Sequence, residues 1–158
     1  MSNQNGTPTI CIIPCAADKL DHSAAAQDLY TSSNFQNTLA AAKIHFDKVL
    51  ILSAKYGLLE LEQVVETYDV QMGKGDSEEV TEETIREQLA DLVEFYHNGG
   101  QIYTQLPKAY RAKIDSLLRN EYVFAEDIYE AAPGIGYQRG VCSSMKYLTP
   151  EVCEQILA

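Results

Sequence analysis

The chain has 158 residues, of which 46% are hydrophobic and 22% charged, a composition typical of one folded domain rather than of a disordered chain. No apolar run reaches the length of a membrane span, and the N-terminus lacks the pattern of a signal peptide, so we expect a cytoplasmic protein. The formal net charge of −11 argues against a general nucleic-acid binder.

Short apolar runs predict the strands. Residues 9–14 and 49–52 are apolar almost throughout, which is typical of strands buried on both faces of a parallel sheet. Two further strands are predicted to begin at residues 102 and 122, the second of them extending to about residue 129.

Capping and breaking residues predict the helices between the strands. Ser32 or Ser33 is expected to cap a helix that extends to about Phe46. Thr81 followed by two glutamates predicts the start of a second helix, which ends at the Asn-Gly-Gly of residues 98–100.

The last third of the chain continues the same alternation. Pro107 is expected to be the first residue of another helix, a turn at 132–136 leads into the next, and Pro150 opens a short final one. This order predicts a single three-layer α/β/α domain over residues 1–158, with a mostly parallel sheet of about four strands and a flexible stretch at 1–7.

Polar residues follow the first two strands at the point where each strand ends. Cys15 and Lys19 come after the first strand, and Ser53, Lys55, Tyr56 and Gly57 come after the second. Because ligands of open α/β sheets collect at the carboxyl ends of strands, this edge is the predicted pocket. Two neighbouring ammonium groups would suit an anionic or electron-rich substrate.

Further loop residues offer carboxylates, phenols and backbone amides to such a pocket. The carboxylates are Asp18, Asp21, Asp69 and Asp127, and the tyrosines are Tyr30, Tyr56, Tyr68 and Tyr137. A phenol can stack on a planar base and still form a hydrogen bond, although tyrosine is also common as core filler. Gly134-Ile135-Gly136, at a predicted helix start, is a weak signal for binding an anion.

Metal and disulfide chemistry are not expected. The four cysteines form no C-x-x-C pair and the three histidines are scattered, so neither a zinc site nor another metal or cofactor is predicted. Of the cysteines, only Cys15 is placed to take part in chemistry.

The negative charge is concentrated in one segment. Residues 60–94 contain twelve acids and only two bases, a net charge of −10 that leaves −1 for the rest of the chain. We expect an acidic flank made of solvated helix faces, separate from the predicted pocket. An alternative is that this segment imitates DNA and binds a DNA-binding partner.

Several short motifs carry a family resemblance. They are Pro14-Cys15-x-x-x-Lys19, Asp28-Leu29-Tyr30-x-Ser32-x-x-Phe35, Ser53-Ala54-Lys55-Tyr56-Gly57-Leu58-Leu59, Tyr68-Asp69 and Gly134-Ile135-Gly136. Together they resemble an uncharacterised domain family of bacteria and their phages. Ala16 and Asp18 stand where that family is expected to have a serine and a second lysine, while Lys19 is retained.

This family in turn distantly resembles the lysine-bearing domain of archaeosine synthase and, through it, the uracil-DNA glycosylase-like fold. The resemblance implies an N-glycosylase that releases a modified base from DNA or a nucleotide, with a possible part in phage defence. Asp69 or Asp127 would supply the carboxylate, and Lys19, Lys55 or Tyr56 would serve the leaving base. Lysine-dependent transfer onto a base and a non-catalytic nucleotide-binding module are the alternatives.

Overall fold

The computed structural model describes residues 6–128, which form twelve helices and strands. The strands are β1 (Thr9–Pro14), β2 (Ala24–Ala25), β3 (Lys48–Ser53), β4 (Gly57–Glu60), β5 (Val64–Val65), β6 (Gln101–Thr104) and β7 (Glu126–Asp127). The helices are α1 (Ala26–Leu29), α2 (Ser33–His45), α3 (Glu82–Gln88), α4 (Ala90–His97) and α5 (Lys108–Asn120).

Five of the strands form one sheet in the order β4-β3-β1-β6-β7. Strands β3, β1, β6 and β7 are parallel, while β4 runs antiparallel to β3 at one edge. The first strand lies in the centre, where Ile12 and Ile13 are completely buried. A separate antiparallel pair, β2 and β5, joins the loop after β1 to the loop after β4.

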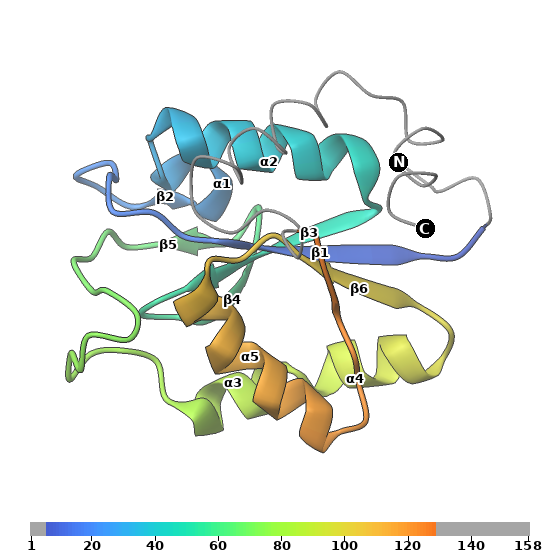
Figure 1. Ribbon diagram of the computed structural model, residues 1–158. Helices are drawn as coiled ribbons and strands as arrows, with labels where there is room; N and C mark the ends of the chain where they lie inside the picture. The colour runs from blue at the N-terminus through green and yellow to red at the C-terminus, as the bar shows by residue number, and fades with distance from the viewer. Residues whose placement is uncertain (1–5, 129–158) are drawn as a thin grey trace.

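Helices cover both faces of the sheet (Figure 1). Helices α1 and α2 lie on one face, and α3, α4 and α5 lie on the other. The described part of the chain is therefore a three-layer α/β arrangement with a mostly parallel sheet, as its alternating pattern predicts.

The caps predicted for two helices are confirmed. The side chain of Ser32 accepts a hydrogen bond from the amide of Phe35, and that of Thr81 accepts one from the amide of Thr84. The predicted second helix is in fact two helices, α3 and α4, which meet at Leu89.

One strand was not predicted, and another prediction needs correction. Ala54, Lys55 and Tyr56 are the loop of a hairpin, and Gly57 begins the antiparallel strand β4, which the sequence pattern did not predict. The strand expected from residue 122 begins only at Glu126, as the two-residue β7. Tyr122 itself has a φ of 58°, outside the β region.

The predicted start of the helix near residue 107 is confirmed to within one residue, since α5 begins at Lys108 and Pro107 precedes it. The stretch predicted to be flexible at 1–7 lies mostly outside the described residues. The predicted turn at 132–136 and the helices after it lie outside them entirely.

Candidate functional site

The candidate site lies at the carboxyl-terminal edge of the parallel strands. Pro14 of β1 is paired with Leu52 of β3, and the amide of Cys15 donates a hydrogen bond to the carbonyl of Leu52 at 3.1 Å. The loops that carry Lys19 and Lys55 therefore leave the sheet at the same edge. This edge is where an open α/β sheet is expected to bind a ligand.

Three hydroxyl groups meet at this edge. The oxygens of Tyr30 and Tyr68 are 2.5 Å apart, and the hydroxyl of Ser53 donates to the oxygen of Tyr68 at 2.8 Å. Tyr30 and Ser53 are completely buried, whereas Tyr68 is partly exposed. We call these three side chains the hydroxyl cluster.

Ser53 is held in place by the hairpin that follows it. Its oxygen accepts hydrogen bonds from the amides of Lys55 at 3.2 Å and Tyr56 at 3.1 Å. The tight loop after β3 thus aims one buried hydroxyl at Tyr68.

The phenols around the cluster are kept protonated. Burial is the main cause that raises the pKa of Tyr30, Tyr68 and Tyr110 above the usual range, and the neighbouring Cys15 adds to the effect. At neutral pH these groups are therefore hydrogen-bonding hydroxyls rather than phenolates.

Lys19 places a positive charge beside the cluster. Its ammonium nitrogen lies 4.2 Å from the centroid of the Tyr68 ring and 5.9 Å from that of Tyr30, within the range of a cation–π interaction. Backbone hydrogen bonds between the segments 18–20 and 29–31 position the loop that carries it.

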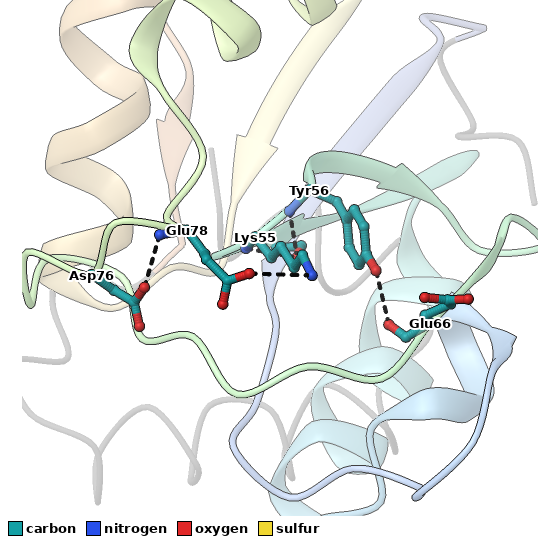
Figure 2. A network of polar contacts seen from close by, with 6 residues as sticks. Lys55, Tyr56, Glu66, Asp76 and Glu78 are labelled. Atoms are coloured by element: carbon teal, nitrogen blue, oxygen red, sulfur yellow. Dashed lines mark hydrogen bonds and ion pairs between the residues drawn. The ribbon is translucent and has the colours of Figure 1, made fainter.

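Lys55 and Tyr56 lie on the hairpin loop and reach the opposite connection, residues 66–80, which we call the strap (Figure 2). The ammonium of Lys55 is 4.0 Å from the carboxylate of Glu78, and the hydroxyl of Tyr56 donates to the carbonyl of Glu66 at 3.1 Å. The rings of Tyr56 and Tyr68 meet edge to face, with centroids 5.4 Å apart. The predicted site residues from the two loops are thus brought together.

The strap is also tied to α5. The carboxylate of Glu79 accepts hydrogen bonds from the ammonium of Lys113 at 2.9 Å and from the amide of Gly73 at 2.8 Å. Burial opposes ionisation of Glu79, but these hydrogen bonds and the charge of Lys113 outweigh it and lower its pKa below the ordinary value. Glu79 is therefore a structural anchor of the strap.

Tyr110 is a neighbour of the site that the sequence did not reveal. Its hydroxyl lies 3.1 Å from the sulfur of Cys15, so it joins the first residue after β1 to α5. In the sheet, β3 pairs with one side of β1, and β6, which comes later in the chain, pairs with the other side. The strand order therefore reverses between β1 and β6, which is the topological switch point of the sheet. The sequence pattern showed Tyr110 only as an inward position of a helix.

The two candidate carboxylates have different surroundings. Asp69 directly follows Tyr68, is exposed, and forms no side-chain hydrogen bond or ion pair within residues 6–128. Asp127 ends β7 at the same edge of the sheet and forms an ion pair with Arg111. A carboxylate already paired with a guanidinium has a structural role that Asp69 lacks.

Gly57 contributes to the site through the backbone. It has a φ of 78°, and a β-carbon at this position would collide with the side chain of Gln88. That side chain accepts from the amide of Leu58 and donates to the carbonyl of Tyr56, so it clamps the hairpin. The structure gives Gly57 this architectural role, while Gly134, Gly136 and Tyr137 lie outside the described residues.

The acidic segment is mostly solvated. Of its twelve acids, all but Glu79 are exposed. The acidic segment was expected to be separate from the pocket, but two of its residues contact the site region. Glu78 pairs with Lys55, and Glu79 anchors the strap.

Within residues 6–128 no three His, Cys, Asp or Glu side chains are grouped so that they could hold a metal ion. In the same part of the chain no helix is long and apolar enough to span a bilayer.

The chain belongs to the family described as "Family of unknown function (DUF6884)", whose model matches residues 10–141. It is also 31% identical over 140 residues to the uncharacterized protein YfjM of Bacillus subtilis (strain 168). The aligned region covers 81% of this chain and 88% of YfjM. An uncharacterised family with a bacterial member agrees with the resemblance seen in the motifs. The more distant resemblances remain predictions.

Proposed function

We propose that this protein is a nucleobase-processing enzyme, an N-glycosylase that releases a modified base from DNA or a nucleotide. The observation that carries the proposal is the hydroxyl cluster at the carboxyl-terminal edge of the sheet, with the ammonium of Lys19 over the Tyr68 ring. The parallel sheet with helices on both faces supports the resemblance to the uracil-DNA glycosylase-like fold.

Hydrolysis of an N-glycosidic bond makes two demands on such a site. The bond between the sugar carbon and the base nitrogen breaks, its electron pair leaves with the base, and the sugar becomes cationic. Water then bonds to the sugar carbon and loses a proton. The site therefore needs donors for the departing base and a carboxylate near the sugar or the water.

The described residues can be assigned to these two roles. The hydroxyl of Tyr68 and the ammonium groups of Lys19 and Lys55 serve the base as hydrogen-bond donors. Asp69 serves the sugar and accepts the proton of the attacking water, because its carboxylate is exposed next to Tyr68. Asp127 is the competing choice, and its pairing with Arg111 places it second.

The direct test is mass spectrometry of bases released from a panel of normal and modified DNAs and nucleosides. Release of one or a few bases is the expected result. If no member of a panel that includes phage-type modified bases is cleaved, the proposed reaction is wrong.

A pair of isosteric variants tests the assignment of the carboxylate. Asp69→Asn should reduce base release by about a hundredfold or more while changing thermal stability little. Asp127→Asn is the matched control, which should mainly lower stability through the weakened pairing with Arg111. The reverse result would transfer the catalytic role to Asp127, and near-normal release by both variants would eliminate the carboxylate mechanism.

A further inference from the structure

The direction of the hydrogen bonds in the hydroxyl cluster can be worked out by counting donors and acceptors. The oxygen of Ser53 already accepts two amide hydrogens, from Lys55 and Tyr56, which uses its two lone pairs. Its single hydrogen is donated to the oxygen of Tyr68 at 2.8 Å. Ser53 is therefore saturated, and it makes Tyr68 an acceptor.

The hydroxyl hydrogen of Tyr30 has only one favourable acceptor among the described residues, the oxygen of Tyr68. Tyr30 is completely buried, and within residues 6–128 its hydroxyl is near hydrogen-bonding partners only at Tyr68, 2.5 Å away, and at Ser53. Donation to Ser53 would require a third hydrogen bond to an oxygen that has two lone pairs. If Tyr68 donated to Tyr30 instead, the buried hydrogen of Tyr30 would have no acceptor, at a cost of about 1–3 kcal/mol. Tyr30 therefore donates to Tyr68.

Both lone pairs of Tyr68 are then occupied, by the hydrogens of Ser53 and Tyr30. The hydrogen of Tyr68 itself is turned away from both partners, and Tyr68 is the partly exposed member of the cluster. Burial raises the pKa of Tyr68, so the hydroxyl keeps this hydrogen at neutral pH. The cluster thus fixes Tyr68 as a donor that cannot act as an acceptor.

We infer that Tyr68 is a specificity-determining residue that selects substrates presenting an oxo group, an acceptor, over those presenting an amino group at the same position. This inference rests on the proposed function, and it names the class of base: oxopyrimidines and oxopurines. The ammonium of Lys19, which lies 4.2 Å from the centroid of the Tyr68 ring, also only donates. An amino group at that position would face these two donors.

The experiment compares pairs of nucleosides that present an oxo group or an amino group at the same ring carbon. Dissociation constants are measured by NMR titration for deoxyuridine against deoxycytidine and for deoxyinosine against deoxyadenosine. The oxo member of each pair should bind about tenfold more tightly, the effect of roughly one hydrogen bond. Tyr68→Phe should abolish this difference, whereas Tyr103→Phe, the same chemical change on β6 away from the cluster, should leave it intact.

Two further measurements test the direction of the hydrogen bonds. Tyr30→Phe should reduce the preference for oxo compounds, because it frees one lone pair of Tyr68, which can then accept a hydrogen bond from an amino group. In the wild-type protein, 4-thiodeoxyuridine should bind more weakly than deoxyuridine, because sulfur is a poorer acceptor than oxygen; this comparison needs no variant to fold.

Equal binding within each pair, tighter binding of the amino members, or no binding of any of the four nucleosides at millimolar concentration would overturn the inference. So would a preference that survives Tyr68→Phe, or inorganic phosphate binding with the same dependence on Tyr68. Base release is scored separately. Release without an oxo preference would keep the proposed function and reject this inference, while an oxo preference without release would do the opposite.

Discussion

The two edges of the parallel sheet place their polar groups in different environments. At the carboxyl-terminal edge, Ser53 and Tyr30 are completely buried neutral hydroxyls that contact Tyr68. At the amino-terminal edge, Lys48 and Glu60 form an ion pair 2.7 Å long whose side chains are 50% and 65% exposed. This second edge also borders a groove of about 490 Å³.

The difference lies in the cost of burial. Water solvates an exposed ion pair almost as well as its partner does, so such a pair contributes little to stability and needs no special surroundings. A buried hydroxyl costs free energy unless every hydrogen bond is satisfied, so a cluster of them constrains the hairpin, the strap and the loop after β1 together. We therefore assign the site to the carboxyl-terminal edge, although a large groove lies at the other.

The largest expected effect comes from removing the oxygen at the centre of this network. Ser53→Ala leaves the amides of Lys55 and Tyr56 without their acceptor, and should lower the free energy of unfolding by about 2–3 kcal/mol. Urea denaturation measures this change. Its counterpart at the other edge is Thr9→Val, which leaves one amide, that of Asp47, without its side-chain acceptor and should cost about 1 kcal/mol. Equal losses in the two variants would contradict the comparison.

The anchor of the strap should give a pH-dependent effect. The lowered pKa of Glu79 means that its ionised form stabilises the fold above the ordinary value of 4.5, and that this contribution is lost as the pH falls through the lower pKa of the folded protein. Glu79→Gln should cost about 1.5 kcal/mol at pH 7. The difference from wild type should shrink below about pH 4.5.

Urea denaturation at pH 7, 5, 4 and 3 follows this difference. Glu62→Gln, an exposed residue of the loop between β4 and β5, is the control and should show almost no difference at any of these values. A gap for Glu79→Gln that stays constant from pH 7 to pH 3 would show that the ionised carboxylate is not what holds the strap.

A smaller loss is expected for Tyr30→Phe. The ring and its packing against Phe35 remain, and the oxygen of Tyr68 loses one donor but no buried hydrogen is stranded. The free energy of unfolding should fall by about 1 kcal/mol, clearly less than for Ser53→Ala. Chemical denaturation of both variants under the same conditions compares them. A loss for Tyr30→Phe as large as that for Ser53→Ala would mean that Tyr30, not Ser53, is the saturated centre of the cluster.

The smallest effect belongs to the amino-terminal edge. Lys48→Met breaks the exposed pair with Glu60 and should change stability by less than about 0.5 kcal/mol. Because exposed charges are screened, the small difference should vanish in about 1 M salt. A loss above 1 kcal/mol would remove the energetic contrast between the two edges.

The elements predicted well from the sequence depend on local chemistry. The apolar runs of β1 and β3 and the caps at Ser32 and Thr81 can be read from neighbouring residues alone. The missed strand β4 is stabilised by partners far along the chain, because Gln88 of α3 clamps the hairpin that begins it. The four residues of β4, Gly57–Glu60, do not by themselves reveal such a contact.

Only the part of the candidate site that depends on local sequence could be predicted. Cys15 and Ser53 could be placed at one edge because both follow strands of a presumed parallel sheet. The contact of Cys15 with Tyr110 depends on β6 pairing with the free side of β1, and strand order is set by long-range pairing that a single sequence does not display. The bond between the hydroxyls of Tyr30 and Tyr68, 38 residues apart, was hidden in the same way.

The central position of β1 also governs how the chain folds as it is synthesised. Ile10 of β1 pairs with Lys48 of β3 on one side and with Ile102 of β6 on the other. During synthesis β1 therefore leaves the ribosome well before β6, its second partner strand. At roughly 5–20 residues per second, that partner follows on the order of 10 s later. During this interval one long edge of an apolar strand is open to other chains. Slow translation before residue 102 should therefore favour aggregation of the nascent protein, whereas the β3–β4 hairpin, whose partners are neighbours in sequence, is complete much earlier.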